Sequence, residues 1–151
     1  MQYQVTAMPG WRFDINGFLV TAFAGLDYQV FRTYPIDPGT NLRGQHMGFR
    51  AAIELWHEPS ATTMLAADAS MSSIGAGNYA RLAYGWRMID QFYLGPEVQA
   101  YVTGNYRHAR VGVHLTASKR YEHEWSAAMG FAEDNERRSG FYVRIGYLTR
   151  R

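Results

Sequence analysis

The sequence predicts an all-β fold, an antiparallel up-and-down transmembrane β-barrel, because eight stretches alternate apolar and polar residues. In each stretch the apolar face carries no charged residue. The last stretch is the clearest, with Phe141, Val143 and Ile145 on one face and Arg144 on the other. A soluble β-protein shows its charges to water, whereas a membrane barrel turns apolar side chains to lipid and keeps polar ones inside. The alternation therefore predicts apolar residues outside and charges inside.

The richness in aromatic residues and glycine, together with the short alternating runs, predicts an all-β barrel or sandwich. Of the 151 residues, 47% are hydrophobic, 15% are aromatic and 15 are glycine, while the mean hydropathy is −0.32. No run approaches the roughly 18–20 apolar residues that a transmembrane helix needs. A net charge of +2 is too small to indicate nucleic acid as a partner. The length fits a single domain over residues 1–151.

Cysteine usage and the N-terminus bear on the compartment. The sequence has no cysteine, which excludes disulfides, thiolate zinc sites and thiol catalysis. Residues 1–10 have neither the basic region nor the apolar region of a signal peptide. A protein bound for the outer membrane must have carried one, so we expect the chain to be a mature or trimmed form.

Each predicted strand follows from its own alternation. The eight strands are expected at 17–31, 45–56, 62–71, 78–88, 92–102, 106–118, 124–132 and about 141–148. Each is about 9–15 residues long, and roughly 9–11 residues cross a bilayer at a tilt. Residues 11–15 also alternate and could end a ninth strand, and ten or more strands are expected if N-terminal strands are missing. Pro96 falls inside the fifth strand, where we expect a bulge or a strand start.

The polar faces of these strands carry five acids and five arginines. Buried charges must be paired or hydrated, and the planar guanidinium of arginine suits bidentate pairing with carboxylates. An eight-stranded barrel is just wide enough to be filled by side chains, so we expect a plugged interior without a large pore. The predicted interior charge network consists of Asp27, Arg50, Glu54, Asp68, Arg81, Arg87, Glu97, Arg110, Glu124 and Arg144.

No motif indicates catalysis, a cofactor or a metal. His108 and His114 share a strand face but lie about 20 Å apart, too far to bind one metal ion. Ser118 lies about 13 Å from His114 along the same face. A triad assembled across strands with Ser126 or Ser70 stays an alternative that nothing in the sequence singles out. We therefore expect no catalytic, cofactor-binding or metal-binding residues and no enzymatic activity.

Aromatic residues cluster near the predicted turns. Outer-membrane barrels carry aromatic girdles at both membrane interfaces. Ordinary strands are also rich in aromatic residues, but the position near turns favours a girdle. The candidates are Trp11, Phe13, Tyr34, Trp56, Tyr79, Phe92, Tyr106, Tyr121, Phe141 and Tyr142.

The second half of the chain resembles a known family. The segments concerned are YARLAYGWR at 79–87, FYLGPEVQA at 92–100, NYR at 105–107, GVHLT at 112–116, EWSA at 124–127 and the ending 137–151, with looser matches at 42–46 and 54–56. Together they resemble the cellulose biosynthesis protein BcsS over roughly residues 42–151. The resemblance implies a proteobacterial outer-membrane protein associated with cellulose synthesis and export. Members of that family are longer than this chain and offer no established catalytic residues to carry over.

Three functions remain open at this point. The first is a non-enzymatic outer-membrane barrel serving cellulose (exopolysaccharide) export, with membrane lipid, other secretion subunits or the glucan itself as partners. The second is a soluble, lipocalin-like barrel, with the apolar faces inside around a small ligand. The third is an outer-membrane enzyme that modifies lipid.

Overall fold

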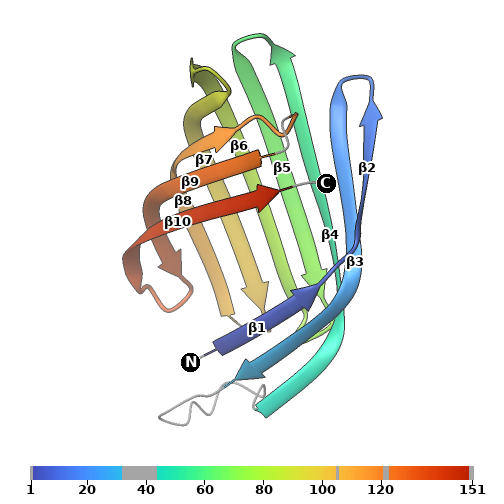
Figure 1. Ribbon diagram of the computed structural model, residues 1–151. Helices are drawn as coiled ribbons and strands as arrows, with labels where there is room; N and C mark the ends of the chain where they lie inside the picture. The colour runs from blue at the N-terminus through green and yellow to red at the C-terminus, as the bar shows by residue number, and fades with distance from the viewer. Residues whose placement is uncertain (1, 32–43, 105, 121–122, 150–151) are drawn as a thin grey trace.

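The structure, a computed structural model, is one antiparallel sheet of ten strands (Figure 1). It describes residues 2–31, 44–104, 106–120 and 123–149, and these contain no helix. The strands are β1 (Gln2–Ala7), β2 (Gly10–Ile15), β3 (Phe18–Phe31), β4 (Gly44–Ser60), β5 (Thr63–Ser72), β6 (Gly77–Ile89), β7 (Phe92–Thr103), β8 (Tyr106–Ala117), β9 (His123–Asp134) and β10 (Ser139–Thr149).

The topology is up-and-down, as the sequence predicts. From β3 to β10 every strand pairs with the next along the chain. At the other edge, β1 and β2 both pair with β3, so they act as one edge strand interrupted at Met8 and Pro9. Proline cannot donate to a ladder, which makes an edge the natural place for it. Figure 1 shows the sheet curling into a half-barrel, and no pairing joins β10 to β1 or β2 among the described residues.

The predicted all-β antiparallel architecture is confirmed, with small differences at the strand ends. All eight predicted strands are present, and residues 11–15 lie in β2. The β2–β3 hairpin turns through Asn16 and Gly17, which have φ values of 53° and 83°. An Asn-Gly pair favours such a two-residue turn because both residues tolerate positive φ. Strand β1 is not predicted from the sequence, since its polar residues Gln2, Gln4 and Thr6 give no strong alternation.

The expected bulge at Pro96 is wrong. β7 begins at Phe92, and the offset between β6 and β7 is the same at Ala83–Glu97 and at Trp86–Leu94, on either side of the proline. The intervening pairs are missing from the ladder, because Pro96 has no N–H to give to Tyr84. The Tyr84 carbonyl instead lies 3.1 Å from Nε2 of His114, a buried side chain of β8.

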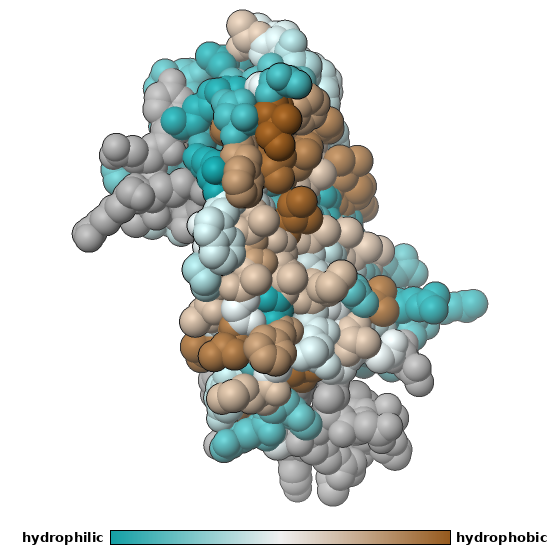
Figure 2. Space-filling model, turned by 90° about the vertical axis from the view of Figure 1, so that its right-hand side faces the viewer, coloured by the Kyte–Doolittle hydropathy of each residue, from teal (hydrophilic) through white to brown (hydrophobic). Residues whose placement is uncertain are grey.

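Side chains on the two faces of the sheet have opposite character. Val111, Val113 and Leu115 on the convex face are 58%, 49% and 40% exposed, whereas Asp27 and Glu97 on the concave face are 0% and 1% exposed. Figure 2 shows one side of the convex face, with brown and tan residues across much of its middle and teal residues mainly towards its ends. This arrangement is the reverse of what a lipocalin-like barrel requires.

The concave face is not polar throughout. Near the end of the half-barrel that carries the β2–β3 and β6–β7 turns, six apolar or aromatic side chains form a buried cluster: Leu19, Trp56, Met64, Ala66, Ala83 and Tyr93. The Trp56 and Tyr93 rings meet edge to face, with centroids 5.8 Å apart. An interior of this kind stabilises the curled sheet from inside, as the core of a small barrel does.

Candidate functional site

The centre of the concave face is organised around the carboxylate of Glu97. Its Oε2 accepts from Nε of Arg81 at 2.9 Å and from Nη2 of Arg144 at 3.1 Å. Its Oε1 accepts from the hydroxyl of Tyr142 at 3.0 Å and from the amide of Gln99. These donors come from β6, β7 and β10, so a single carboxylate ties the β10 edge to strands three positions away in the sheet.

Two glycines make the reach from β10 to Glu97 feasible. In the register of the sheet, Glu97, Gly112, Gly130 and Tyr142 form one row across β7, β8, β9 and β10. A Cβ at Gly112 would lie 2.7 Å from the Tyr142 hydroxyl, and a Cβ at either glycine would collide with a backbone carbonyl of the neighbouring strand. The absence of these two side chains lets the sheet bend sharply and lets the tyrosine lie across it.

A second carboxylate, Asp27 on β3, is just as deeply buried. Its Oδ2 accepts from Arg50 Nη2 at 2.9 Å, from Ser72 Oγ at 2.7 Å and from Gln29 Nε2 at 2.8 Å. Gln4 of β1 donates to its Oδ1 at 3.2 Å. This cluster therefore connects the interrupted edge strand to β3, β4 and β5.

The β8–β9 turn folds across one end of the half-barrel. Nζ of Lys119, the sole lysine of the sequence, donates to Glu54 Oε2 at 2.6 Å. From the opposite edge, Arg12 of β2 donates to the Lys119 carbonyl and to Glu124 Oε1, both at 3.0 Å. Ser118 donates to Glu58 Oε1 at 2.6 Å. These contacts bring the two edges of the sheet towards each other at this end.

The predicted charge network divides into these groups. Asp27 pairs with Arg50, and Arg81 joins Glu97 to Asp68, whose Oδ2 lies 2.7 Å from Arg81 Nη1. Two acids pair with cations outside the predicted network: Glu54 with Lys119 and Glu124 with Arg12. Parity, the even or odd position of a residue along a strand, shows which charged residues share a face of the sheet. A residue in a turn or in an interrupted edge strand has no such signal.

Two predicted members, Arg87 and Arg110, contact aromatic rings. Arg87 Nη2 donates to the Tyr93 hydroxyl at 2.6 Å, and its guanidinium lies 5.1 Å from the centre of that ring. The Arg110 guanidinium lies 5.2 Å from the centre of the Tyr142 ring. Both distances fall within the range of cation–π attraction.

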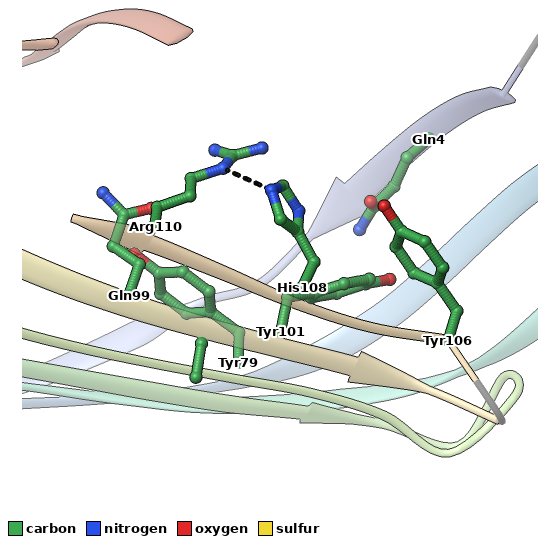
Figure 3. A pocket seen from close by; sticks show the side chains of 8 residues that line it. Gln4, Tyr79, Gln99, Tyr101, Tyr106, His108 and Arg110 are labelled. Carbon is green, nitrogen blue, oxygen red and sulfur yellow. Dashed lines mark hydrogen bonds between the residues drawn. The ribbon is translucent and has the colours of Figure 1, made fainter. Parts of the chain in front are cut away.

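Beyond Gln99, the concave face opens into a pocket of about 380 Å³ at the end of the half-barrel that carries the β7–β8 turn (Figure 3). We call it the tyrosine pocket, since Tyr79, Tyr101 and Tyr106 supply its rings. The other residues that line it are Gln4, Gln99, Ala100, His108 and Arg110.

The aromatic residues near turns do not form one set. Trp11, Phe13 and Phe141 are 55%, 53% and 62% exposed on the convex face. Trp56 and Tyr142 are buried inside, and Tyr79 and Tyr106 line the tyrosine pocket, so their assignment to an outer girdle is wrong. They share strand parity with inward charges such as Arg81 and Arg110, a signal that was present in the sequence. Tyr34 and Tyr121 lie outside the described residues, and Phe92 is half-buried.

Among the histidines and serines that could serve a catalytic site, His114, Ser70 and Ser118 have hydrogen-bond partners in the structure. His114 Nδ1 lies 2.9 Å from Thr116 Oγ1, and Ser70 accepts from Arg50 at 3.4 Å. Ser118 is bound to Glu58, and Ser126 lines a second, more charged cavity of about 210 Å³ between Arg81 and Arg144. Within the described part of the chain, no three His, Asp or Glu side chains are grouped so that they could hold a metal ion.

The convex face carries aromatic side chains towards both ends. At one end the rings of Trp125 and Tyr147 lie 4.4 Å apart and those of Tyr84 and Trp86 5.0 Å apart. Towards the other end, Phe131 and Phe141 meet edge to face at 6.0 Å. The described residues include no helix long and apolar enough to cross a membrane.

Comparison with known proteins identifies the family. No curated protein and no solved structure gives a significant match to the chain. The family model described as Cellulose biosynthesis protein BcsS matches residues 1–151, the whole sequence, including the N-terminal 41 residues that the resemblance above leaves out. The chain therefore belongs to the cellulose biosynthesis protein BcsS family.

Proposed function

We propose that this protein is a non-enzymatic β-barrel of the bacterial outer membrane that serves the synthesis and export of cellulose. Membership of the BcsS family supports the link to cellulose biosynthesis. The location and the mode of action are inferred from the distribution of charge between the two faces of the sheet.

The observation that carries this proposal is the inside-out arrangement of side chains. Large apolar residues are more than half exposed on strands from both edges of the sheet and from its middle, including Val5, Phe49, Val111 and Ile145. A soluble monomer rarely exposes a continuous apolar surface of this extent. Since the apolar surface extends over the whole sheet, a lipid environment covers it better than a single protein partner does.

The residue types on the convex face vary along the strands in the way that suits a bilayer, with polar and aromatic residues towards the ends. On the described strands its charged residues are Arg107 and Glu133, both near the end that holds the tyrosine pocket. Tryptophan and tyrosine lie towards the other end, where their rings suit a membrane–water interface. Most charges of the inner face are paired, as those of Asp27, Glu97 and Glu54 are, which favours a structural role for them over chemistry.

Tryptophan quenching by brominated phospholipids tests this orientation, because the chain offers a matched pair. Trp86 is 52% exposed on the convex face, whereas Trp56 is fully buried on the concave face. Variants that keep one of these tryptophans, with the others changed to phenylalanine, are reconstituted into vesicles. We expect strong quenching of Trp86 and weak quenching of Trp56.

Equal quenching of the two residues would contradict a lipid-facing convex surface. A protein that stays monomeric in buffer without detergent would also contradict it. Separation of inner and outer membranes from the native bacterium, followed by detection of the protein, tests the compartment independently.

A further inference from the structure

We propose that the tyrosine pocket is a binding site for a short stretch of neutral, β-linked glucan. This inference rests on the proposed role in cellulose export and adds a location and a set of contacts. Its chemistry follows from the rings, the free polar groups and the charge of the pocket.

Aromatic rings from three neighbouring strands form the floor of the pocket. Tyr101 on β7 is paired in register with Tyr79 on β6 and with His108 on β8. Tyr106 stands next to His108, with ring centroids 6.1 Å apart. Figure 3 shows these side chains extending to the same side of the sheet, with Gln4 of β1 facing Tyr106. Aromatic faces suit the C–H-bearing faces of a pyranose ring.

The polar groups around this floor have hydrogen-bonding capacity that the described residues do not use. Among the described residues, the hydroxyls of Tyr79, Tyr101 and Tyr106 make no hydrogen bond, although all three residues are half-buried. Gln99 uses its amide N–H to bind Glu97, which leaves its carbonyl oxygen as an acceptor. A ligand rich in hydroxyl groups, each both donor and acceptor, matches such a lining.

The charge of the pocket favours a neutral ligand. None of its described lining residues is acidic. Its guanidinium, that of Arg110, is already placed against the Tyr142 ring and makes a long contact of 3.5 Å from Nε to His108 Nε2. Because Arg110 already has these contacts, its role at the wall of the pocket is that of a hydrogen-bond donor. A site for an anion would instead gather several free cations.

The position and size of the pocket limit the ligand to a short segment. Its volume of about 380 Å³ lies near the small end of ligand pockets, which run from about 300 to 1,000 Å³. Deeper in the half-barrel, Gln99 and the pair of Glu97 with Arg81 fill the concave face. The pocket therefore suits docking of a chain segment at the mouth of the barrel.

Isothermal titration with cellotetraose tests the proposal directly. The full chain is studied in a zwitterionic detergent, because a detergent with a sugar headgroup would compete for the site. Removing one ring, as in Tyr101→Ala, is expected to weaken binding roughly three- to tenfold. Tyr106→Ala, at the start of β8, repeats the test where the sheet is easier to alter without unfolding.

A tyrosine of the convex face provides the matched control. Tyr28 pairs with Met47 on the outer side of β3 and β4, so Tyr28→Ala should leave cellotetraose binding unchanged. Tyr101→Phe keeps the ring and should retain most of the affinity.

Three results would overturn the glucan site: no binding by the unaltered protein, equal losses in Tyr106→Ala and Tyr28→Ala, or tighter binding of an oligogalacturonate than of cellotetraose. None of them affects the quenching of Trp86 by lipid, which tests the membrane role separately. Conversely, cellotetraose binding by a protein that stays monomeric without detergent would support the glucan site and contradict the membrane proposal.

Discussion

The carboxylates of Asp27 and Glu97 are both fully buried on the concave face, yet their charges are balanced differently. Asp27 has one arginine, Arg50, and otherwise accepts from neutral donors of β1, β3 and β5. Glu97 accepts from two arginines as well as from Gln99 and Tyr142.

The difference follows from what each cluster holds together. Asp27 lies next to the edge formed by β1, so neutral side chains reach it from β1 and from its own strand, and Ser72 reaches it from β5 across β4. Glu97 holds β10, whose side chains must reach across two intervening strands. Long arginine and tyrosine side chains supply that reach, and Gly112 and Gly130 leave the space for it. The comparison suggests that the β10 edge depends on charge more than the β1 edge does.

The largest loss of stability is expected for Glu97→Gln. The change leaves Arg144 without a carboxylate among its described contacts and leaves Arg81 with Asp68 alone. Removing one partner of a buried ion pair costs about 3 kcal/mol or more, and here two arginines lose a contact, Arg81 with a side chain 5% exposed and Arg144 with one 32% exposed. Urea unfolding in detergent micelles, followed by tryptophan fluorescence, measures the change in the free energy of unfolding.

Glu133→Gln serves as the control for this experiment. Glu133 is exposed near the end of β9, and neutral changes at such positions usually alter stability by less than about 0.5 kcal/mol. Equal unfolding midpoints for the two variants would show that Glu97 does not hold the β10 edge.

A smaller loss, about 2 kcal/mol, is expected for Asp27→Asn. Asparagine keeps one oxygen for Ser72 and Gln29 but no longer neutralises Arg50. Asp27 neutralises one arginine, whereas Glu97 contacts two, so the change at Asp27 leaves less uncompensated positive charge. The same urea experiment measures this loss, with Glu136→Gln as the control because that side chain is 59% exposed. A loss larger than that of Glu97→Gln would reverse the proposed order of the two clusters.

Most strands and the sidedness of the sheet could be predicted from the sequence, because a strand has a period of two residues and the eight predicted strands show it. The same parity placed Asp27, Arg50, Arg81 and Glu97 on one face. Strand β1 was not predicted, since QYQVTA carries few apolar residues and lies at an edge with one neighbour.

Partners within the interior could not be predicted, because they depend on register and on curvature. Lys119 reaches Glu54 from a turn, and Arg12 reaches Glu124 from the opposite edge of the sheet. The tyrosine pocket was missed for another reason. Tyr79 and Tyr106 lie near turns, which indicates a membrane girdle, whereas their even or odd positions along the strands place them on the concave side.

The smallest loss of stability is expected when the hydroxyl group of Tyr142 is removed. Tyr142→Phe removes one hydrogen bond to Glu97 and leaves the ring against Arg110, so we expect a loss of about 1 kcal/mol. Tyr147→Phe removes the exposed contact of the Tyr147 hydroxyl with His123 and should cost less than about 0.5 kcal/mol. If the two variants unfold at the same urea concentration, the Tyr142 hydroxyl adds no stability beyond that of the arginines, and charge alone holds the β10 edge.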